Sequence, residues 1–147
     1  MMIAAILKET TLGENRVAAT PKTVKELIKS GLTVRIQSEA GKASFYTDQD
    51  YIDAGAEVIS DISSLYNNVN ILLKVAPATI EEIESFPNGT AYVSLMQTTR
   101  QSQQVQKLTE KNITGFSMHL IPRTTLAQSM DALSSQANIS GYKSVLV

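Results

Sequence analysis

Apolar residues along the chain gather in short runs that alternate with segments of helical periodicity. There are six runs of five or six residues, and most of them lack a strict polar alternation, which is typical of strands covered on both faces of a sheet. These predicted strands are Met2 to Leu7, Thr33 to Ser38, Ala56 to Ser60, Asn70 to Val75, Ala91 to Leu95 and Thr114 to Met118.

The segments between the predicted strands carry helix start and stop signals. Thr20 and Pro21 give the first helix an N-cap and a first-turn proline, and Gly31 ends it. Thr79 and Glu82 form a capping box at the start of the third helix, which ends at "FPNG". The second and fourth predicted helices span Thr47 to Ala54 and Ser102 to Lys111. This alternation predicts an α/β fold, a three-layer, doubly wound, mostly parallel sheet of flavodoxin-like or Rossmann-like kind.

Composition narrows the functional classes. The 147 residues are 43% hydrophobic, which suits one compact domain with a core. A net charge of −1 gives no field that attracts nucleic acid or an anionic membrane, so we expect no nucleic-acid partner. The absence of cysteine excludes disulfides, zinc–thiolate sites and a thiol nucleophile, and it fits a reducing cytoplasm.

Candidate chemistry lies where the predicted strands end, because ligands of doubly wound sheets bind beyond the carboxyl ends of the strands. Arg16 follows the first strand and can clamp a carboxylate, or it can form an ion pair with Glu14 or Glu26. Lys74 ends the fourth strand with its stem buried, so its ammonium needs either a protein carboxylate or an anionic ligand.

The stretch "RTTLAQSMDALSSQANISGY", from Arg123 to Tyr142, is the most informative. Pro122 breaks the last strand, and a helix is predicted to begin near Thr125 or Leu126. Gln128, Asp131 and Ser135 then share one helical face, with Arg123 able to reach back over it. This cluster is either a site for an amide-bearing ligand or a capping network around one arginine.

Several ligand-binding motifs are missing. The chain has no G-x-G-x-x-G and no G-x-x-x-x-G-K-[ST], so it has no evident phosphate cradle of its own. The single histidine, His119, is interpreted as a loop imidazole, and no metal site is expected.

Three segments carry a family resemblance that covers essentially the whole chain. "KET…GENRVAATPKTVKELIKSGLTV", "ILLKVAP" and "IPRTTLAQSMDALSSQANISGYKSV" resemble the N-terminal domain of the alanine dehydrogenase/pyridine nucleotide transhydrogenase family, and the last segment is most similar to transhydrogenase alpha subunits. The resemblance implies an N-terminal domain over residues 1–137. It also implies that residues 138–147 start the helix crossing to an NAD-binding Rossmann domain, which would carry the missing glycine motif.

The resemblance also implies function. The family transfers hydride between NAD(H) and NADP(H), and transhydrogenases couple this transfer to proton translocation. Arg123, Gln128 and Asp131 match the positions that orient the nicotinamide, and Thr124 and Ser134 join them in binding the cofactor. Implied partners are an NADP(H)-binding component or beta subunit, a membrane-spanning component and a second copy in a homodimer of the full subunit. The implied location is cytoplasmic, peripheral on the inner membrane.

Departures from the family pattern leave alternatives. Many transhydrogenases carry a second arginine where this chain has Leu126. Arg16 and Lys74 match residues that grip the substrate carboxylate in alanine dehydrogenases, but Ser94 stands where those enzymes have a histidine. The alternatives are an alanine dehydrogenase domain and a stand-alone, non-catalytic binding module.

Two properties are expected of the chain by itself. Without a phosphate cradle it should bind NAD weakly or not at all. Its last apolar residues, Val145, Leu146 and Val147, predict self-association or fraying of the final helix.

Overall fold

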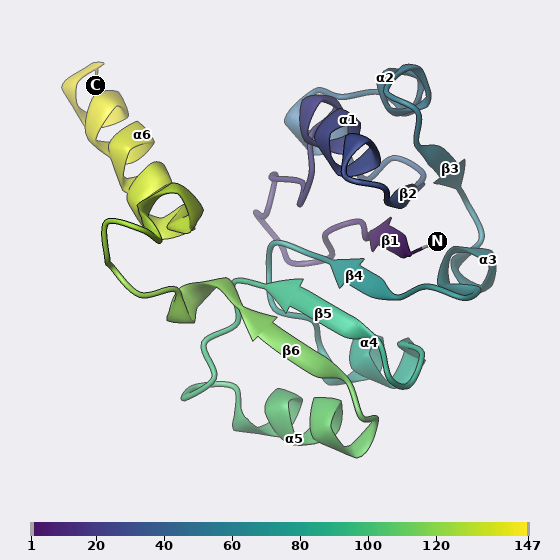
Figure 1. Cartoon of the computed structure of the whole chain (residues 1–147). Helices are drawn as coiled ribbons and strands as arrows, with labels where there is room; N and C mark the ends of the chain where they lie inside the picture. The colour runs from purple at the N-terminus through teal and green to yellow at the C-terminus, as the bar shows by residue number, and fades with distance from the viewer. Residues whose placement is uncertain (1, 147) are drawn as a thin grey trace.

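Six strands form one sheet in which all neighbours run parallel (Figure 1). A computed structural model describes residues 2–146 of the chain. The spatial order is β3-β2-β1-β4-β5-β6, the doubly wound Rossmann order, so the predicted fold class is confirmed. The strands are β1 (Ile3–Ile6), β2 (Thr33–Gln37), β3 (Glu57–Ile59), β4 (Ile71–Leu73), β5 (Ala91–Ser94) and β6 (Thr114–Ser117).

The four helices predicted between strands are present, and side-chain caps explain where three of them begin. The Thr20 side chain accepts a hydrogen bond from the Thr23 backbone at the start of α1 (Pro21–Lys29), and capping boxes open α2 (Asp48–Asp53) and α4 (Ile80–Ser85). A further helix, α3, was not predicted because five residues with one buried side chain, Leu65, are too short to show a helical period. The helices are α1 (Pro21–Lys29), α2 (Asp48–Asp53), α3 (Ile62–Tyr66), α4 (Ile80–Ser85), α5 (Ser102–Glu110) and α6 (Ala132–Leu146).

Two hydrophobic clusters lie on opposite faces of the sheet. On one face, Val24 of α1 and Tyr51 of α2 pack against β1 and β2. On the other face, α3, α4 and α5 pack against β1, β4 and β5 through the side chains of Leu65, Ile83, Phe86 and Leu108. The expected three layers therefore form.

Helix cover on the α1–α2 face ends partway across the sheet. Strand register aligns one row of side chains across all six strands: Val58, Ile36, Ile6, Leu73, Val93 and Phe116. Ile36 and Ile6 are fully buried in this row, whereas Phe116 is 54% exposed. We call the uncovered part of this face the open sheet face. It comprises Ile71, Leu73, Ala91, Val93 and Phe116.

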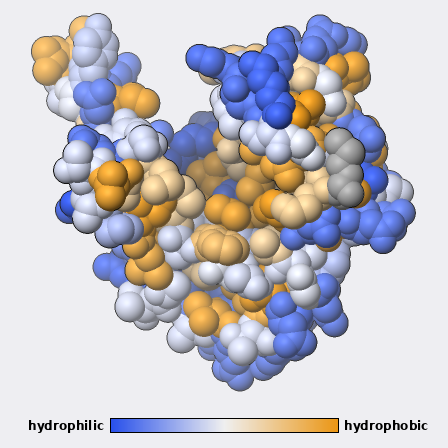
Figure 2. All heavy atoms as spheres, in the orientation of Figure 1, coloured by the Kyte–Doolittle hydropathy of each residue, from blue (hydrophilic) through white to orange (hydrophobic). Residues whose placement is uncertain are grey.

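The last helix, α6, projects away from the carboxyl end of the sheet (Figure 1). Its main contact is with η2, a 3₁₀ turn over Met118–Leu120 that follows β6. Figure 2 shows apolar residues over the middle of the sheet, in a hollow beside α6. None of the helices within residues 2–146 has the length and apolar character needed to cross a membrane.

Candidate functional site

The carboxyl ends of β1 and β4 meet at the switch point, where the chain leaves neighbouring strands toward opposite faces. Glu9, just after β1, connects the segments that follow these two strands. Its two carboxylate oxygens accept hydrogen bonds from the backbone N–H groups of Val75 (2.6 Å) and Ala76 (3.1 Å). Burial raises the pKa of Glu9, although these hydrogen bonds and the nearby Lys74 work in the opposite direction.

Lys74 follows β4 and finds its anionic partner within the protein. Its side chain is fully buried, and its Nζ atom lies 2.6 Å from both carboxylate oxygens of Glu82 and 3.2 Å from the Thr10 hydroxyl. Burial by itself raises the pKa of Glu82, but the hydrogen bonds from Lys74, the Thr79 backbone and Thr10 together bring it below the ordinary 4.5. Of the two alternatives for Lys74, the structure shows the protein carboxylate.

Arg16 is also paired within the chain. Its guanidinium donates to Glu14 in a bidentate arrangement, with Nε 2.8 Å from Oε1 and Nη2 2.7 Å from Oε2. The hydrogen bond from Arg16 is the main cause that holds the pKa of Glu14 below its usual range. The Arg16 side chain is nevertheless partly exposed, and Nη1 has no partner within residues 2–146.

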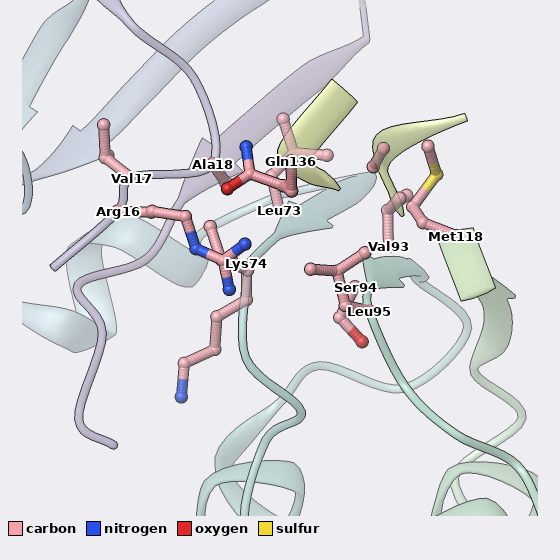
Figure 3. A pocket seen from close by; sticks show the side chains of 12 residues that line it. Arg16, Val17, Ala18, Leu73, Lys74, Val93, Ser94, Leu95, Met118 and Gln136 are labelled. Atoms are coloured by element: carbon pink, nitrogen blue, oxygen red, sulfur yellow. The ribbon is translucent and has the colours of Figure 1, made fainter. Parts of the chain in front are cut away.

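A cavity of about 320 Å³ lies between this arginine, the carboxyl ends of β4 and β5, and the first turns of α6 (Figure 3). Arg16 and Gln136 point into it, whereas the Lys74 amine points away, toward Glu82. Leu73, Val93 and Met118 give the cavity an apolar wall. The cavity therefore offers one partly paired cation, Arg16, because the Lys74 ammonium is bound by Glu82.

Ser94, at the end of β5, occupies the position that the resemblance matches to the histidine of alanine dehydrogenases. The residue is 1% exposed, and its Oγ atom has no hydrogen-bond partner within residues 2–146. His119, the single imidazole, lies in η2 on the surface. The cavity thus has no imidazole that could serve as an acid or base.

A second pocket, of about 260 Å³, brings together all five residues of the predicted cofactor cluster. Arg123, Thr124, Gln128, Asp131 and Ser134 line it together with Thr125. The exposed side chains of Arg123 and Gln128 make no hydrogen bond or ion pair with another described residue. We call this pocket the 123–134 pocket.

The predicted start of the last helix was wrong. Ile121 is extended before Pro122, as expected, but the chain then makes a 3₁₀ turn over Gln128–Met130, and α6 begins only at Ala132. The reason is Asp131, whose Oδ1 accepts from the backbone N–H groups of Leu133 (3.0 Å) and Ser134 (3.2 Å). Aspartate is favoured as an N-cap over the helix interior. Gln128, Asp131 and Ser135 consequently do not share a helical face.

Asp131 should titrate below the ordinary aspartate value of 3.8. The Ser134 hydroxyl (2.5 Å from Oδ2) is the largest cause that lowers its pKa, followed by the Ser134 backbone, with smaller contributions from Leu133 and Arg123. A lowered folded-state pKa means that the cap stabilises α6 above pH 3.8 and is lost as pH falls through the folded value. Carboxyl ¹³C NMR should place the midpoint below 3.8, and Ser134→Ala should move it upward. A midpoint at or above 3.8 in the unmodified chain contradicts the capping geometry.

The two pockets lie on different sides of the first turns of α6. Ala132 and Gln136 face the Arg16 cavity, whereas Asp131 and Ser134 face the 123–134 pocket. The structure therefore places Arg16 and Lys74, the two candidates for binding an anion, apart from the 123–134 pocket, whose residues are the candidates for binding an amide. Across residues 2–146, no group of three His, Cys, Asp or Glu side chains is arranged to hold a metal ion.

Comparisons with known proteins show the family of the chain. The model of the family described as "Alanine dehydrogenase/PNT, N-terminal domain" matches residues 5–140, so the chain belongs to this family. Within the family, it is 39% identical to the NAD(P) transhydrogenase subunit alpha of Haemophilus influenzae over 99% of its own length. The alanine dehydrogenase of Staphylococcus haemolyticus is 30% identical over the same share.

A solved structure gives the same relationship. The crystal structure of the transhydrogenase from Sinorhizobium meliloti superimposes with a TM-score of 0.92 at 35% identity, over 98% of this chain. The chain spans 28% of the Haemophilus subunit, 38% of the Staphylococcus enzyme and 43% of the Sinorhizobium chain.

Proposed function

We propose that the chain is the N-terminal domain of the alpha subunit of a proton-translocating NAD(P) transhydrogenase, which exchanges hydride between NAD(H) and NADP(H). The observation that carries the proposal is the 123–134 pocket, where a guanidinium and a carboxamide are left without protein partners beside a capped helix. The similarity of almost the whole chain to transhydrogenase alpha subunits supports it. In this proposal α6 continues into a Rossmann domain that cradles the NAD phosphates, so the boundary between residues 137 and 138 falls inside α6.

The donors and acceptors of the pocket fit a nicotinamide carboxamide, which offers one carbonyl acceptor and two N–H donors. Arg123 can donate to the carbonyl oxygen, and Gln128 can both donate and accept. Asp131 is 7% exposed and already accepts three hydrogen bonds, so it fixes the pocket wall through Ser134 and the start of α6. Thr124 and Thr125 add hydroxyl groups at the rim.

The bound nicotinamide supplies the hydride chemistry itself. The residues of this domain then have to hold the carboxamide so that one ring face meets the second nicotinamide at near-attack distance, and to exclude water. Hydride transfer between two nicotinamides requires no general base, which agrees with the surface position of His119 and with the lack of an imidazole beside Ser94. The NADP(H)-binding component and the membrane-spanning component are the partners that this function requires.

Alanine oxidation is the second candidate, because an alanine dehydrogenase is 30% identical to the chain. Its chemistry requires a grip on the substrate carboxylate and an acid or base for the imine. Lys74 is held by Glu82, Arg16 is held by Glu14, and the matching side chain on β5 is a serine. The described residues therefore favour hydride exchange between nucleotides.

A chimeric subunit tests the proposal. Residues 1–147 would replace the matching N-terminal segment of the Haemophilus alpha subunit, and the assay would follow reduction of an NADP⁺ analogue by NADH in the presence of the partner components. We expect hydride transfer between the nucleotides and no oxidation of NADH by pyruvate and ammonia. A folded chimera that binds NADH but transfers hydride only to pyruvate and ammonia would overturn the proposal.

The 147-residue chain by itself should bind NADH weakly or not at all, since the described residues offer contacts to the nicotinamide end only. Isothermal titration should detect no binding tighter than about 1 mM, which corresponds to about −4 kcal/mol. Micromolar affinity for the isolated chain would contradict the division of the site between two domains.

A further inference from the structure

The turn that joins α4 to β5 contains the one asparagine of the chain that is followed by glycine, Asn88 before Gly89. Both residues are exposed, and the Asn88 side chain makes no hydrogen bond with another residue of the described range 2–146. The turn precedes β5 and therefore lies at the amino end of the sheet, whereas both pockets and the start of α6 lie at the carboxyl end. Its chemistry is independent of the proposed hydride transfer.

Asparagine is a chemically labile residue, because its side chain can react with the backbone of the next residue. The backbone nitrogen of that residue gives its proton to a base and attacks the side-chain Cγ atom. The N–Cγ bond forms, the Cγ–Nδ2 bond breaks, and ammonia leaves. Water then opens the five-membered imide ring at either carbonyl carbon, which produces aspartate or isoaspartate. Water is the only co-reactant, and a side chain on the second residue hinders the attack.

The backbone at Gly89 suits this attack. Its φ of +75° is a conformation that favours glycine, and no atom lies within 4 Å of the position that a β-carbon would occupy. The nitrogen of Gly89 therefore has no side chain beside it. The carboxamide of Asn88 can turn toward this nitrogen without breaking a contact to another described residue.

One hydrogen bond opposes the reaction. The Gly89 N–H donates to the carbonyl of Lys111 over 3.2 Å, and this bond has to open before the nitrogen can attack. It belongs to an exposed turn and not to a strand ladder, and bonds of this kind open by local fluctuation while the rest of a domain stays folded. The turn thus slows the attack without closing the site.

Other asparagines of the chain are less suited. Asn70, Asn112 and Asn138 are each followed by isoleucine, whose branched side chain shields its own backbone nitrogen. At Asn112 the next N–H, that of Ile113, also donates over 2.8 Å to the carbonyl of Leu108, a shorter bond than the one at Gly89.

We propose that Asn88 is a site of spontaneous, age-dependent modification, at which the Gly89 nitrogen expels the side-chain amide and leaves isoaspartate at the entry to β5. The product carries a new negative charge and one additional backbone carbon between Asn88 and Gly89. Thr90, the next residue, is 3% exposed, and its carbonyl accepts from the Thr114 backbone at 2.9 Å. The longer link therefore strains the chain where β5 begins to pair with β6.

Ageing of the folded chain in mildly alkaline buffer tests the proposal. Peptide mass spectrometry should show conversion of amide to acid at Asn88 before any other asparagine, and a protein isoaspartyl methyltransferase should label residue 88. Asn88→Gln is the matched control, because it keeps an exposed amide but would have to close a six-membered ring. This variant should lose the labelling and keep the stability of the unmodified chain.

Three results would overturn the proposal. Conversion to aspartate without isoaspartate would show that water attacks the side chain directly, with no part for the Gly89 nitrogen. Conversion in the urea-unfolded chain but not in the folded chain would show that the bond to Lys111 closes the site. Equal rates at Asn88 and Asn112 would remove the advantage assigned to glycine.

Discussion

Replacing Glu82 with alanine is expected to lower the free energy of unfolding by about 3 kcal/mol or more, since removal of one partner from a buried ion pair costs about 3–5 kcal/mol. The Lys74 ammonium has no exposed surface, and it would retain only the Thr10 hydroxyl at 3.2 Å. The same substitution removes the carboxylate that accepts from the Thr79 backbone at the start of α4. Urea unfolding followed by circular dichroism measures the change.

Glu82 both pairs with Lys74 and caps α4, and two further variants test which of these roles causes the loss of stability. Glu81→Ala removes an exposed carboxylate from the same turn of α4 and should change stability little. Lys74→Met combined with Glu82→Ala should be more stable than Glu82→Ala by about 1–3 kcal/mol, because no ammonium is then left unpaired. A double variant as unstable as the single one would show that the ion pair is not the cause.

The effect of Glu82 should also depend on pH. Hydrogen bonds lower the folded-state pKa of Glu82 in spite of its burial. The stabilisation is therefore complete above the ordinary value of 4.5 and is lost as pH falls through the folded value. The difference in stability between the unmodified chain and Glu82→Ala should shrink below pH 4.5, and a difference that grows there would contradict the assignment.

The fold was accessible from the sequence because its signals are local. Buried parallel strands give continuous apolar runs, and the capping threonines at 20, 47 and 79 set three helix starts directly. Helix α3 was not predicted, because five residues with a single buried leucine are too few to show a helical period.

The site was accessible only in part. The five residues of the 123–134 pocket lie close together in sequence, so their meeting could be predicted. The partner of Lys74 could not be chosen, because a lysine at a strand end is compatible with a protein carboxylate or with a ligand. The capping box at Thr79 placed Glu82 in the helix after that strand, and this was the one available signal.

The start of α6 shows how two local preferences compete. The break at Pro122 placed the predicted helix start near Thr125 or Leu126, and this boundary was wrong. Asp131 prefers to accept from the N–H groups of the residues two and three positions ahead, and it ends the preceding 3₁₀ turn. The sequence suggested that Asp131 is one of several polar residues on a helical face. In the structure it caps the first turn and so sets where the helix begins.

Replacing Arg123 with alanine in the chimeric subunit is expected to reduce hydride transfer about 100-fold at saturating nucleotide, the cost of about 1 Å of misplacement between reacting groups. Arg123 is exposed and has no protein partner within residues 2–146, so its loss should not change stability. If its task is to orient the carboxamide, NADH affinity should fall much less than the rate, because the phosphates are held elsewhere. Stopped-flow transfer and NADH titration separate the two effects.

Arg100 provides the matched control for Arg123. It is an exposed arginine that follows β5 at the same carboxyl edge of the sheet, but it lines neither the 123–134 pocket nor the Arg16 cavity. Arg100→Ala should transfer hydride at nearly the unmodified rate, and Arg123→Lys should recover only part of the loss because an ammonium lacks the planar fork of a guanidinium. Equal losses in Arg100→Ala and Arg123→Ala would assign the effect to general charge, whereas an unchanged rate in Arg123→Ala would remove this residue from the nicotinamide site.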